Sequence, residues 1–284
     1  MRPARVIGVH RNHIVDLMTL DGPQLGKPAG RLLKGKVEAV AMPAVGDWVA
    51  ADRDGTVQEV LPRRTTLARR ADADRERVQV LAANVDVVVV VSSLNKDHDI
   101  ERLTRMVTLA EGSGARTVVA LSKTDLVEDA APALAETRDR CPRSEVVAFS
   151  SKSGEGLEEL KTSLLPGETV VMLGASGVGK STLANTLLGR KRQKTAKIRG
   201  RDDRGRHATT SRELFPLPGG ALLIDTPGLR APGVLTEDAA EFDAEREARV
   251  EQLAAECKFR DCGHESEPGC AVKAAIEAGE LSAR

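Results

Sequence analysis

The pattern of hydrophobic and polar positions changes near residue 67. Before it, short alternating segments at 5–9, 13–17, 37–40, 46–50 and 55–61 are separated by turn signals such as Gly22-Pro23 and Asp54-Gly55. Alternation with a period of two is typical of half-buried strands. Residues 1–66 are therefore predicted to form a small antiparallel β-barrel, with the oligonucleotide-binding (OB) fold as the leading candidate. The basic pairs Arg63-Arg64 and Arg69-Arg70 indicate a connector after the barrel.

A second pattern begins with an almost continuous β-branched run at 85–91. Such a run is typical of a strand buried on both faces of a parallel sheet. Further strands are predicted at 117–121, 145–149, 169–173 and 221–224, and helices at 100–111, 130–138, 157–164 and 182–188. Strands that alternate with helices at this spacing predict a three-layer α/β domain, here over residues 67–232.

Residues 233–284 are acidic and helical in pattern, with a last short helix near 271–278. They are predicted to form a third, α-helical domain, so the expected fold class is multidomain. The domain also carries a Cys/His cluster, Cys257-x4-Cys262-x-His264-x5-Cys270. Three thiolates and one imidazole match a closed tetrahedral site for structural zinc. Cys141 lies apart from this cluster.

Composition limits the possible partners and locations. Hydrophobic residues make up 41% and charged residues 30% of the 284, as expected for a globular protein, and the net charge is zero. A polyanionic partner is still possible, because residues 190–206 contain nine basic and two acidic side chains. Aromatic residues are only 2%, which weakens any model of RNA binding that depends on base stacking. The sequence shows neither an apolar membrane span nor a signal core, so a cytoplasmic location is expected.

A phosphate-binding loop is predicted at Gly174–Ser181, which fits G-x-x-x-x-G-K-[ST] between a strand and a helix. Backbone N–H groups cradle phosphate at such a helix N-terminus, Lys180 reaches the β- and γ-phosphates, and Ser181 ligates Mg²⁺. Asp225-Thr226-Pro227-Gly228 follows a later strand, where the acid can hold the water shell of Mg²⁺ and Gly228 can bind the γ-phosphate. The predicted residues at the phosphates are Gly174, Ala175, Ser176, Gly177, Val178, Gly179, Lys180, Ser181, Thr182, Asp225 and Gly228.

A guanine-reading segment is predicted at Ser122-Lys123-Thr124-Asp125. The Asp125 carboxylate can accept the N1–H and 2-amino groups of guanine, while the Lys123 stem covers the base. Ser122 stands where Asn is usual, and its hydroxyl can still tie the loop to neighbouring backbone. Ser150-Ser151-Lys152 resembles the small loop that offers a backbone N–H to guanine O6. The nucleotide is therefore expected to be GTP or GDP.

The order of these motifs is rotated. In most GTPases the phosphate loop comes first and the base reader last, whereas here Asp125 precedes Gly174 by about fifty residues. This order indicates a circularly permuted GTPase domain.

Residues 190–211 lie between the phosphate loop and Asp225 and are rich in Arg, Lys and Gly. One of their threonines is expected to bind Mg²⁺ and the γ-phosphate. The basic run is either an RNA contact or a solvated loop. Leu229 occupies the place where many GTPases carry a Gln that positions water, so His207 is a candidate for assisting hydrolysis. A surface histidine without a catalytic role is the alternative.

Taken together, these residues resemble the family of bacterial ribosome small subunit-dependent GTPase A. The resemblance rests on residues 45–49, 82–86, 174–181 and 225–229, on Gly205-Arg206-His207 with Thr209-Thr210, and on the Cys/His cluster. It implies an OB barrel, a permuted GTPase domain and a zinc domain in a monomer. It also implies GTP hydrolysis stimulated by the 30S subunit, a role in late subunit maturation, and contact with 16S rRNA.

The family usually has a third threonine where Ala208 stands, so the Mg²⁺ role passes to Thr209 or Thr210. The expected catalytic set is His207, Thr209, Thr210 and Lys180. Two other functions stay open. One is a permuted GTPase paralogue with a different RNA or protein target. The other is a nucleotide-gated RNA-binding switch with little hydrolysis of its own.

Overall fold

The computed structural model describes residues 1–33, 42–71, 74–95, 98–175, 177–189, 212–225, 234–235, 253–254, 257 and 270–277. The chain divides into two compact units, Met1–Thr236 and Glu237–Arg284. None of the helices in the described ranges is long and apolar enough to cross a membrane.

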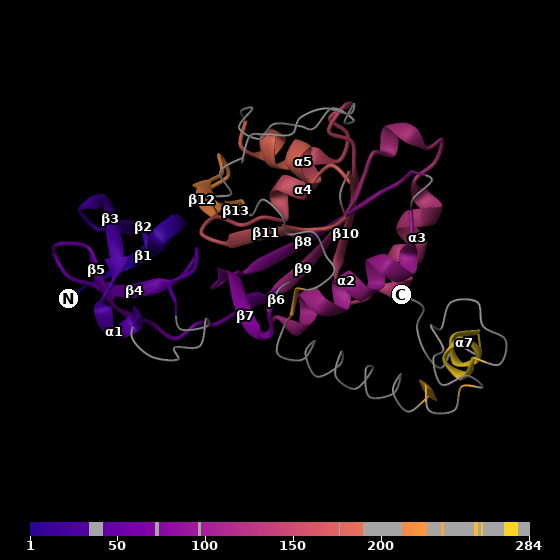
Figure 1. Cartoon of the computed structure of the whole chain (residues 1–284). Coiled ribbons are helices and arrows are strands. Elements are labelled where there is room, and N and C mark those ends of the chain that lie inside the picture. The colour runs from indigo at the N-terminus through magenta and orange to yellow at the C-terminus, as the bar shows by residue number, and fades with distance from the viewer. Residues whose placement is uncertain are drawn as a thin grey trace, which may run out of the picture. The chain divides into compact units, whose positions relative to one another are not determined.

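The first unit begins with a closed five-stranded barrel (Figure 1). Its strands are β1 (Arg2–Val9), β2 (Val15–Thr19), β3 (Gly22–Pro28), β4 (Trp48–Ala51) and β5 (Thr56–Val60). The pairings β1–β2, β2–β3, β3–β5, β5–β4 and β4–β1 close the ring. Alternate residues fill its interior, including Val6, Leu17, Val49 and Val57. The predicted five-stranded barrel is therefore confirmed, except that β3 and β5 pair in parallel and not antiparallel.

The third strand of the barrel differs from the prediction. It is β3, which starts at Gly22 immediately after a turn, whereas the predicted segment at 37–40 lies outside the described residues. A short 3-10 turn η1 (Arg11–His13) delays the start of β2, and the helix α1 (Gly30–Leu33) follows β3. The alternation in β3 was hidden because its outward residues include the apolar Pro23 and Leu25, while its inward positions carry Gly, Gln and Pro instead of large apolar side chains.

The predicted basic connector is wrong for the residues after Thr65. β6 (Thr66–Ala71) and β7 (Asp74–Ala83) form an antiparallel hairpin, and β14 (Val234–Leu235) adds a third strand to β6. The charged residues near the tip of the hairpin made this segment resemble a loop. Backbone pairing does not require apolar side chains, and the hairpin is anchored by buried residues at its base, such as Leu67 and Leu81.

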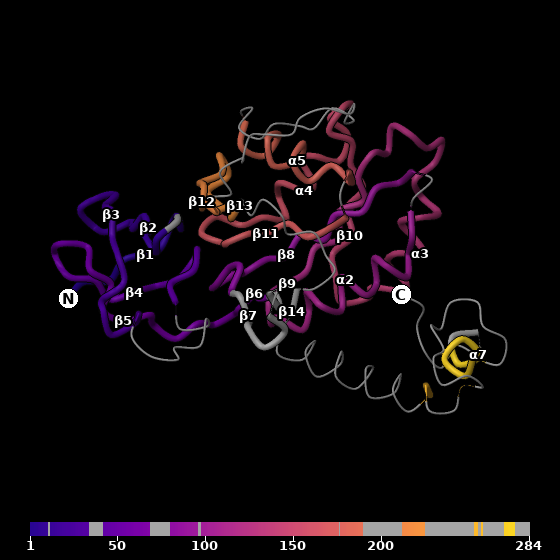
Figure 2. The backbone as a smooth tube through the Cα atoms, in the orientation of Figure 1, coloured from indigo at the N-terminus to yellow at the C-terminus, as the bar shows by residue number. Residues whose placement is uncertain are grey.

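The α/β sheet has the strand order β10-β9-β8-β11-β13-β12. It is built from β8 (Val87–Ser93), β9 (Arg116–Ser122), β10 (Glu145–Phe149), β11 (Thr169–Leu173), β12 (Arg212–Pro216) and β13 (Leu222–Asp225). The first five strands in this order are parallel and β12 is antiparallel to β13. Every residue of β8 is buried, as the β-branched run predicted. The tube in Figure 2 follows the chain from the barrel through β6 and β7 into this sheet.

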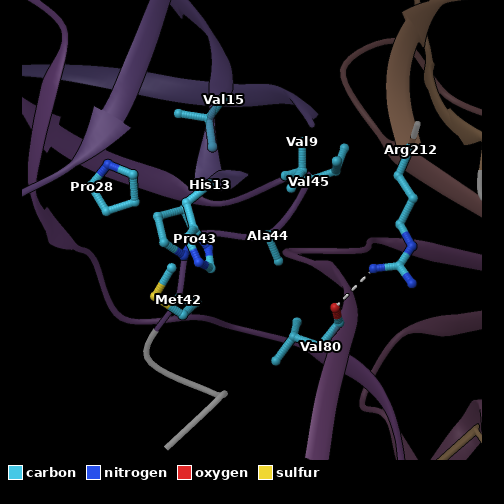
Figure 3. Close-up of a pocket in the computed structure, with 10 residues that line it drawn as sticks. All are labelled: Val9, His13, Val15, Pro28, Met42, Pro43, Ala44, Val45, Val80 and Arg212. Atoms are coloured by element: carbon cyan, nitrogen blue, oxygen red, sulfur yellow. Dashed lines mark hydrogen bonds between the residues drawn. The ribbon is translucent and has the colours of Figure 1, made fainter. Parts of the chain in front are cut away.

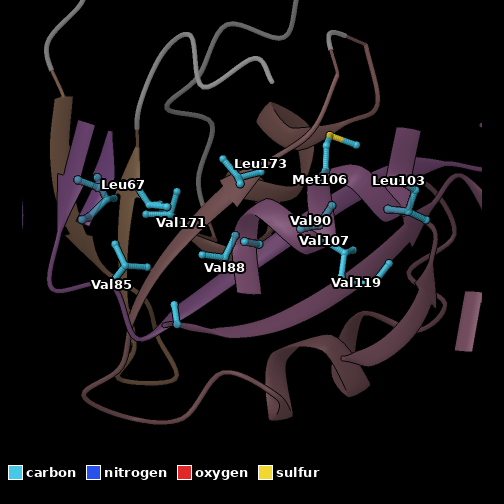
Figure 4. Close-up of a cluster of buried hydrophobic side chains, with 14 of the residues drawn as sticks. Leu67, Val85, Val88, Val90, Leu103, Met106, Val107, Val119, Val171 and Leu173 are labelled. Carbon is cyan, nitrogen blue, oxygen red and sulfur yellow. The ribbon is translucent and has the colours of Figure 1, made fainter. Parts of the chain in front are cut away.

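Helices cover both faces of the sheet, which confirms the three-layer prediction. α2 (Ile100–Gly112) and α3 (Ala131–Arg140) pack on one face, while α4 (Leu157–Thr162) and α5 (Lys180–Leu187) pack on the other. Successive valines of β8 point to opposite faces, so Val88 and Val90 meet α2, as Figure 4 shows, and Val89 meets the other layer.

The joint between the barrel and the sheet is formed by Gly46, Asp47, Arg63 and Asn84. Gly46 and Asn84 both have left-handed backbones, and Asn84 Nδ2 donates to Gly46 O at 3.1 Å. A Cβ on Gly46 would lie 2.1 Å from Ala83 O, so only glycine fits there. Beside them, the Arg63 guanidinium donates to both oxygens of Asp47 at 2.7 Å, and that carboxylate is fully buried. Such a pair holds its elements in one geometry because separating it would leave a buried charge unpaired.

The described part of the second unit contains the helix α7 (Ala271–Glu277), which confirms the predicted short helix. Leu253, Cys270, Val272 and Ala275 form a small core around it. The rest of the predicted helical pattern lies outside the described residues.

Candidate nucleotide-binding site

The predicted nucleotide segments meet at one edge of the sheet. β9 ends at Ser122, Ser150 follows β10, Gly174 follows β11, and β13 ends at Asp225. These four strands are parallel, so their carboxyl ends lie at the same edge. In open α/β sheets, ligands bind outside the carboxyl ends of the strands.

The backbone of the phosphate loop requires glycine at position 174. Gly174 has φ 148°, and a Cβ there would lie 2.3 Å from Val91 O. The loop leads directly into α5, which begins at Lys180, two residues earlier than predicted. Lys180 Nζ donates to the carbonyl oxygens of Gly174 at 2.5 Å and Ala175 at 2.6 Å. The lysine therefore lies over its own loop, where its charge can meet phosphate.

Ser122 joins the base-reading segment to the phosphate loop. Its buried hydroxyl donates to Val178 O at 2.6 Å, across 56 positions of sequence. The Ser122 carbonyl in turn accepts from Leu94 N at 2.8 Å. The sequence predicted that this hydroxyl would bind neighbouring backbone, and the structure identifies that backbone as the phosphate loop itself.

Asp125 is held by the loop after β10. Ser150 Oγ donates to Asp125 Oδ1 at 2.7 Å, and Lys152 Nζ lies 3.7 Å from Asp125 Oδ2. The Ser150 hydroxyl also accepts the backbone N–H groups of Lys152 and Ser153. The Ser150 hydrogen bond is the main reason why the pKa of Asp125 lies below its usual range, and Lys152 adds to the effect. Asp125 is therefore an ionised acceptor at neutral pH.

Sequence reasoning assigned Ser150 to the nucleotide but missed this contact with Asp125. The spacing between β9 and β10 does not show which side chains of the two loops meet. Their parallel pairing, with Phe149 opposite Ser122, is what places Ser150 beside the base-reading segment.

Several predicted residues lie outside the described part of the chain. They are Ser176, His207, Thr209, Thr210, Gly228, Cys262 and His264. The backbone of Asp225 is described and ends β13 beside the strand that carries the phosphate loop. The proposed roles of these residues stay predictions.

A separate cavity of about 220 Å³ lies away from this edge (Figure 3). Its walls come from the barrel, residues 42–45, β7 and β12, and are mainly apolar. Two of its lining residues are joined by a hydrogen bond, which Arg212 Nη1 donates to Val80 O at 3.4 Å. None of the predicted nucleotide residues lines it, so the cavity is not the nucleotide site.

In the second unit, two of the four predicted zinc ligands are described. Cys257 Sγ and Cys270 Sγ lie 3.9 Å apart without a disulfide. Two Zn–S bonds of about 2.3 Å at a tetrahedral angle place their sulfurs about 3.8 Å apart. This pair of thiols therefore fits a zinc ion.

Comparison with known proteins agrees with this geometry. The family model described as RsgA GTPase matches residues 60–235. The chain belongs to the RsgA GTPase family. It is 45% identical to the small ribosomal subunit biogenesis GTPase RsgA of Opitutus terrae, over 98% of this chain and 79% of that protein. The protein of the same name from Streptomyces coelicolor is 43% identical, with 99% and 77% covered.

Solved structures support the same fold. YjeQ from Thermotoga maritima matches with a TM-score of 0.62 and 27% identity, covering 99% of this chain and 93% of that one. YloQ, described as a circularly permuted GTPase, matches with a TM-score of 0.57 and 25% identity, covering 99% and 90%. The RsgA-family chain is therefore a GTP-hydrolysing enzyme whose GTPase fold is circularly permuted, as the motif order predicted.

Proposed function

We propose that this RsgA-family GTPase binds the 30S ribosomal subunit and hydrolyses GTP during late maturation of that subunit. The proposal that the chain binds a guanine nucleotide rests on the hydrogen bond from Ser122 to Val178. This bond joins the base-reading segment to the phosphate loop, although the two motifs are in rotated order. The small subunit as partner is supported by the relatives named for its biogenesis, which match almost the whole chain.

Within the site, Asp125 reads guanine, Ser150 orients that carboxylate, and Lys180 neutralises phosphate charge. Mg²⁺ is held by Ser181 with Thr209 or Thr210, and Asp225 and Gly228 act at the metal and the γ-phosphate. Because the Leu229 side chain has no polar atom to orient water, His207 assists hydrolysis.

The proposed domains are the OB barrel at 1–66, the GTPase domain at 67–232 and a helical zinc domain at 233–284. Cys257, Cys262, His264 and Cys270 hold one structural zinc, which is supported by the sulfur spacing of the two described cysteines. The barrel and the basic run at 190–206 contact 16S rRNA, and the protein acts as a monomer in the cytoplasm without membrane contact.

The test is multiple-turnover phosphate release from GTP with and without purified 30S subunits. We expect 30S subunits to raise the turnover at least about tenfold, which corresponds to about 1.4 kcal/mol of barrier. 50S subunits and ATP serve as controls and should give no rise. Equal turnover with and without 30S subunits would contradict the proposal and favour a paralogue with another activator.

A further inference from the structure

Trp48 is the single tryptophan of the chain, and it is 43% exposed on the outer surface of the barrel. It begins β4 and lies directly opposite Arg5 of β1. The Arg5 guanidinium carbon is 5.3 Å from the centroid of the indole, within the range of a cation–π contact. An exposed indole with a guanidinium against it forms a large, flat and polarised surface.

Other contacts hold Arg5 in place. Its Nη2 donates to Thr169 Oγ1 at 2.6 Å, and its Nε donates to Gly46 O at 3.4 Å. Burial is the main cause that lowers the pKa of this guanidinium. Since Arg5 is tied to both β11 and the joint, the indole that it supports is ordered before any partner binds, which lowers the entropy cost of binding.

A second guanidinium lies near the first. The Arg64 side chain is 75% exposed and pairs with Asp86 at 3.0 Å. The other oxygen of Asp86 accepts from the Thr169 backbone N–H, and the Thr169 hydroxyl accepts from Arg5, so a chain of contacts connects the two guanidinium groups. Asp86 and Arg64 also act in opposite directions on the pKa of Arg5. Asp47, the other acid acting on Arg5, is buried against Arg63. An exposed ion pair such as Arg64–Asp86 contributes little to stability, so Arg64 can exchange its partner for a phosphate at low cost.

The exposed apolar surface around Trp48 is small. The next outward pair along β1 and β4 is Pro3 and Ala50. On the other side of Arg5, the neighbour on β2 is Met18, which is also 43% exposed. The apolar surface beside the indole is therefore limited to a few small or flexible side chains. A stable protein–protein interface needs a far larger patch with a buried core. One flat ring with a nearby exposed cation instead matches one base and its phosphate.

We propose that Trp48 is the stacking platform for an unpaired RNA base and that Arg64 binds an adjoining phosphate. The inference rests on the proposed function only in taking RNA as the partner of the barrel. It also revises the expectation from composition, because a single preordered indole is sufficient to stack one base. The partner is a single-stranded segment, since bases inside an RNA helix cannot stack on a side chain.

Trp48 reports on its own site, because the chain has no Tyr and no second Trp. The full-length protein is titrated at low salt with a decamer of adenylate RNA, and tryptophan emission is recorded beside the anisotropy of a labelled decamer. We expect emission to be quenched along the same binding curve as the anisotropy. Unchanged emission at saturating RNA would overturn the proposal, even if the emission responded to a ribosomal protein.

Variants of Trp48 test whether the indole stacks on a base. Trp48→Leu keeps an apolar side chain and should weaken binding of the decamer about 5- to 150-fold, while Trp48→Phe should lose less. Leu25→Ala is the matched control, because Leu25 is also an exposed apolar residue on the barrel, and it should bind as the unchanged protein does.

An abasic decamer of the same length retains the phosphates and lacks the bases. Trp48→Leu and the unchanged protein should bind it equally well. Equal loss on both decamers would show that the substitution acts through the fold or through charge, and equal binding of the adenylate decamer by both proteins would exclude stacking. Stimulation of GTP turnover by 30S subunits is scored separately, so the proposed function can fail or stand independently.

Discussion

Replacing Asp125 with asparagine is expected to change the base preference from guanine to xanthine. The ionised carboxylate accepts two donors of guanine, whereas an amide would accept N1–H and donate to the C2 oxygen of xanthine. Losing two charge-assisted hydrogen bonds of about 1.5–3 kcal/mol each should weaken GTP binding about 10²- to 10⁴-fold. Equilibrium binding of GTP and XTP to the purified variant measures both changes.

Asp139→Asn makes the same chemical change on α3, where the side chain is exposed, and serves as the matched control. It should bind GTP as the unchanged protein does. If Asp125→Asn bound GTP with unchanged affinity, Asp125 would not be the base reader, and the part assigned to Ser150 as its positioning partner would also be wrong.

Removal of zinc is expected to unfold the second unit and leave the first unit folded. The described core of the second unit is small, with Leu253, Cys270 and Val272 at its centre. Structural zinc in small domains contributes about 10–16 kcal/mol, so a core of this size depends on the metal. The measurement is the zinc content of the purified protein, expected to be one ion per chain, followed by circular dichroism during chelation.

Two cysteine variants test which thiols hold the metal. Cys257→Ser should lower the zinc content, because the Sγ atoms of Cys257 and Cys270 lie 3.9 Å apart, a spacing that suits two thiolates on one zinc ion. Cys141→Ser should keep it, because Cys141 is buried in the first unit, where burial raises the pKa of its thiol. Metal-free protein with a folded second unit, or zinc loss in Cys141→Ser alone, would contradict the assignment.

The sequence predicted most of the α/β domain because its signals are local. The β-branched run before Ser92 requires burial on both faces, and the glycines around Lys180 allow few alternatives to a phosphate loop. The barrel was predicted in strand number, although β3 was missed because two of its outward residues are apolar and its inward residues are Gly, Gln and Pro. The hairpin β6–β7 was missed because its charged residues made the segment resemble a loop. Its backbone pairing is supported by buried residues at the base of the hairpin, such as Leu67 and Leu81.

Contacts between segments could not be predicted in the same way. That Ser122 would bind backbone followed from its hydroxyl, but Val178 as the acceptor follows only from the placement of β9 and β11 on either side of β8. The Ser150–Asp125 hydrogen bond likewise depends on the register of β9 and β10. The Arg5–Trp48 contact arises from the closure of the barrel, which no local pattern encodes.

Motifs in rotated order form one guanine-specific site in the proposed function. Titration calorimetry of the nucleotide-free protein with GDP and with ADP, both with Mg²⁺, tests it most directly. We expect GDP to bind and ADP to bind at least about 100-fold more weakly, since adenine would leave the Asp125 carboxylate without its donors. Equal affinity for GDP and ADP would show that Asp125 and the phosphate loop do not act as one site.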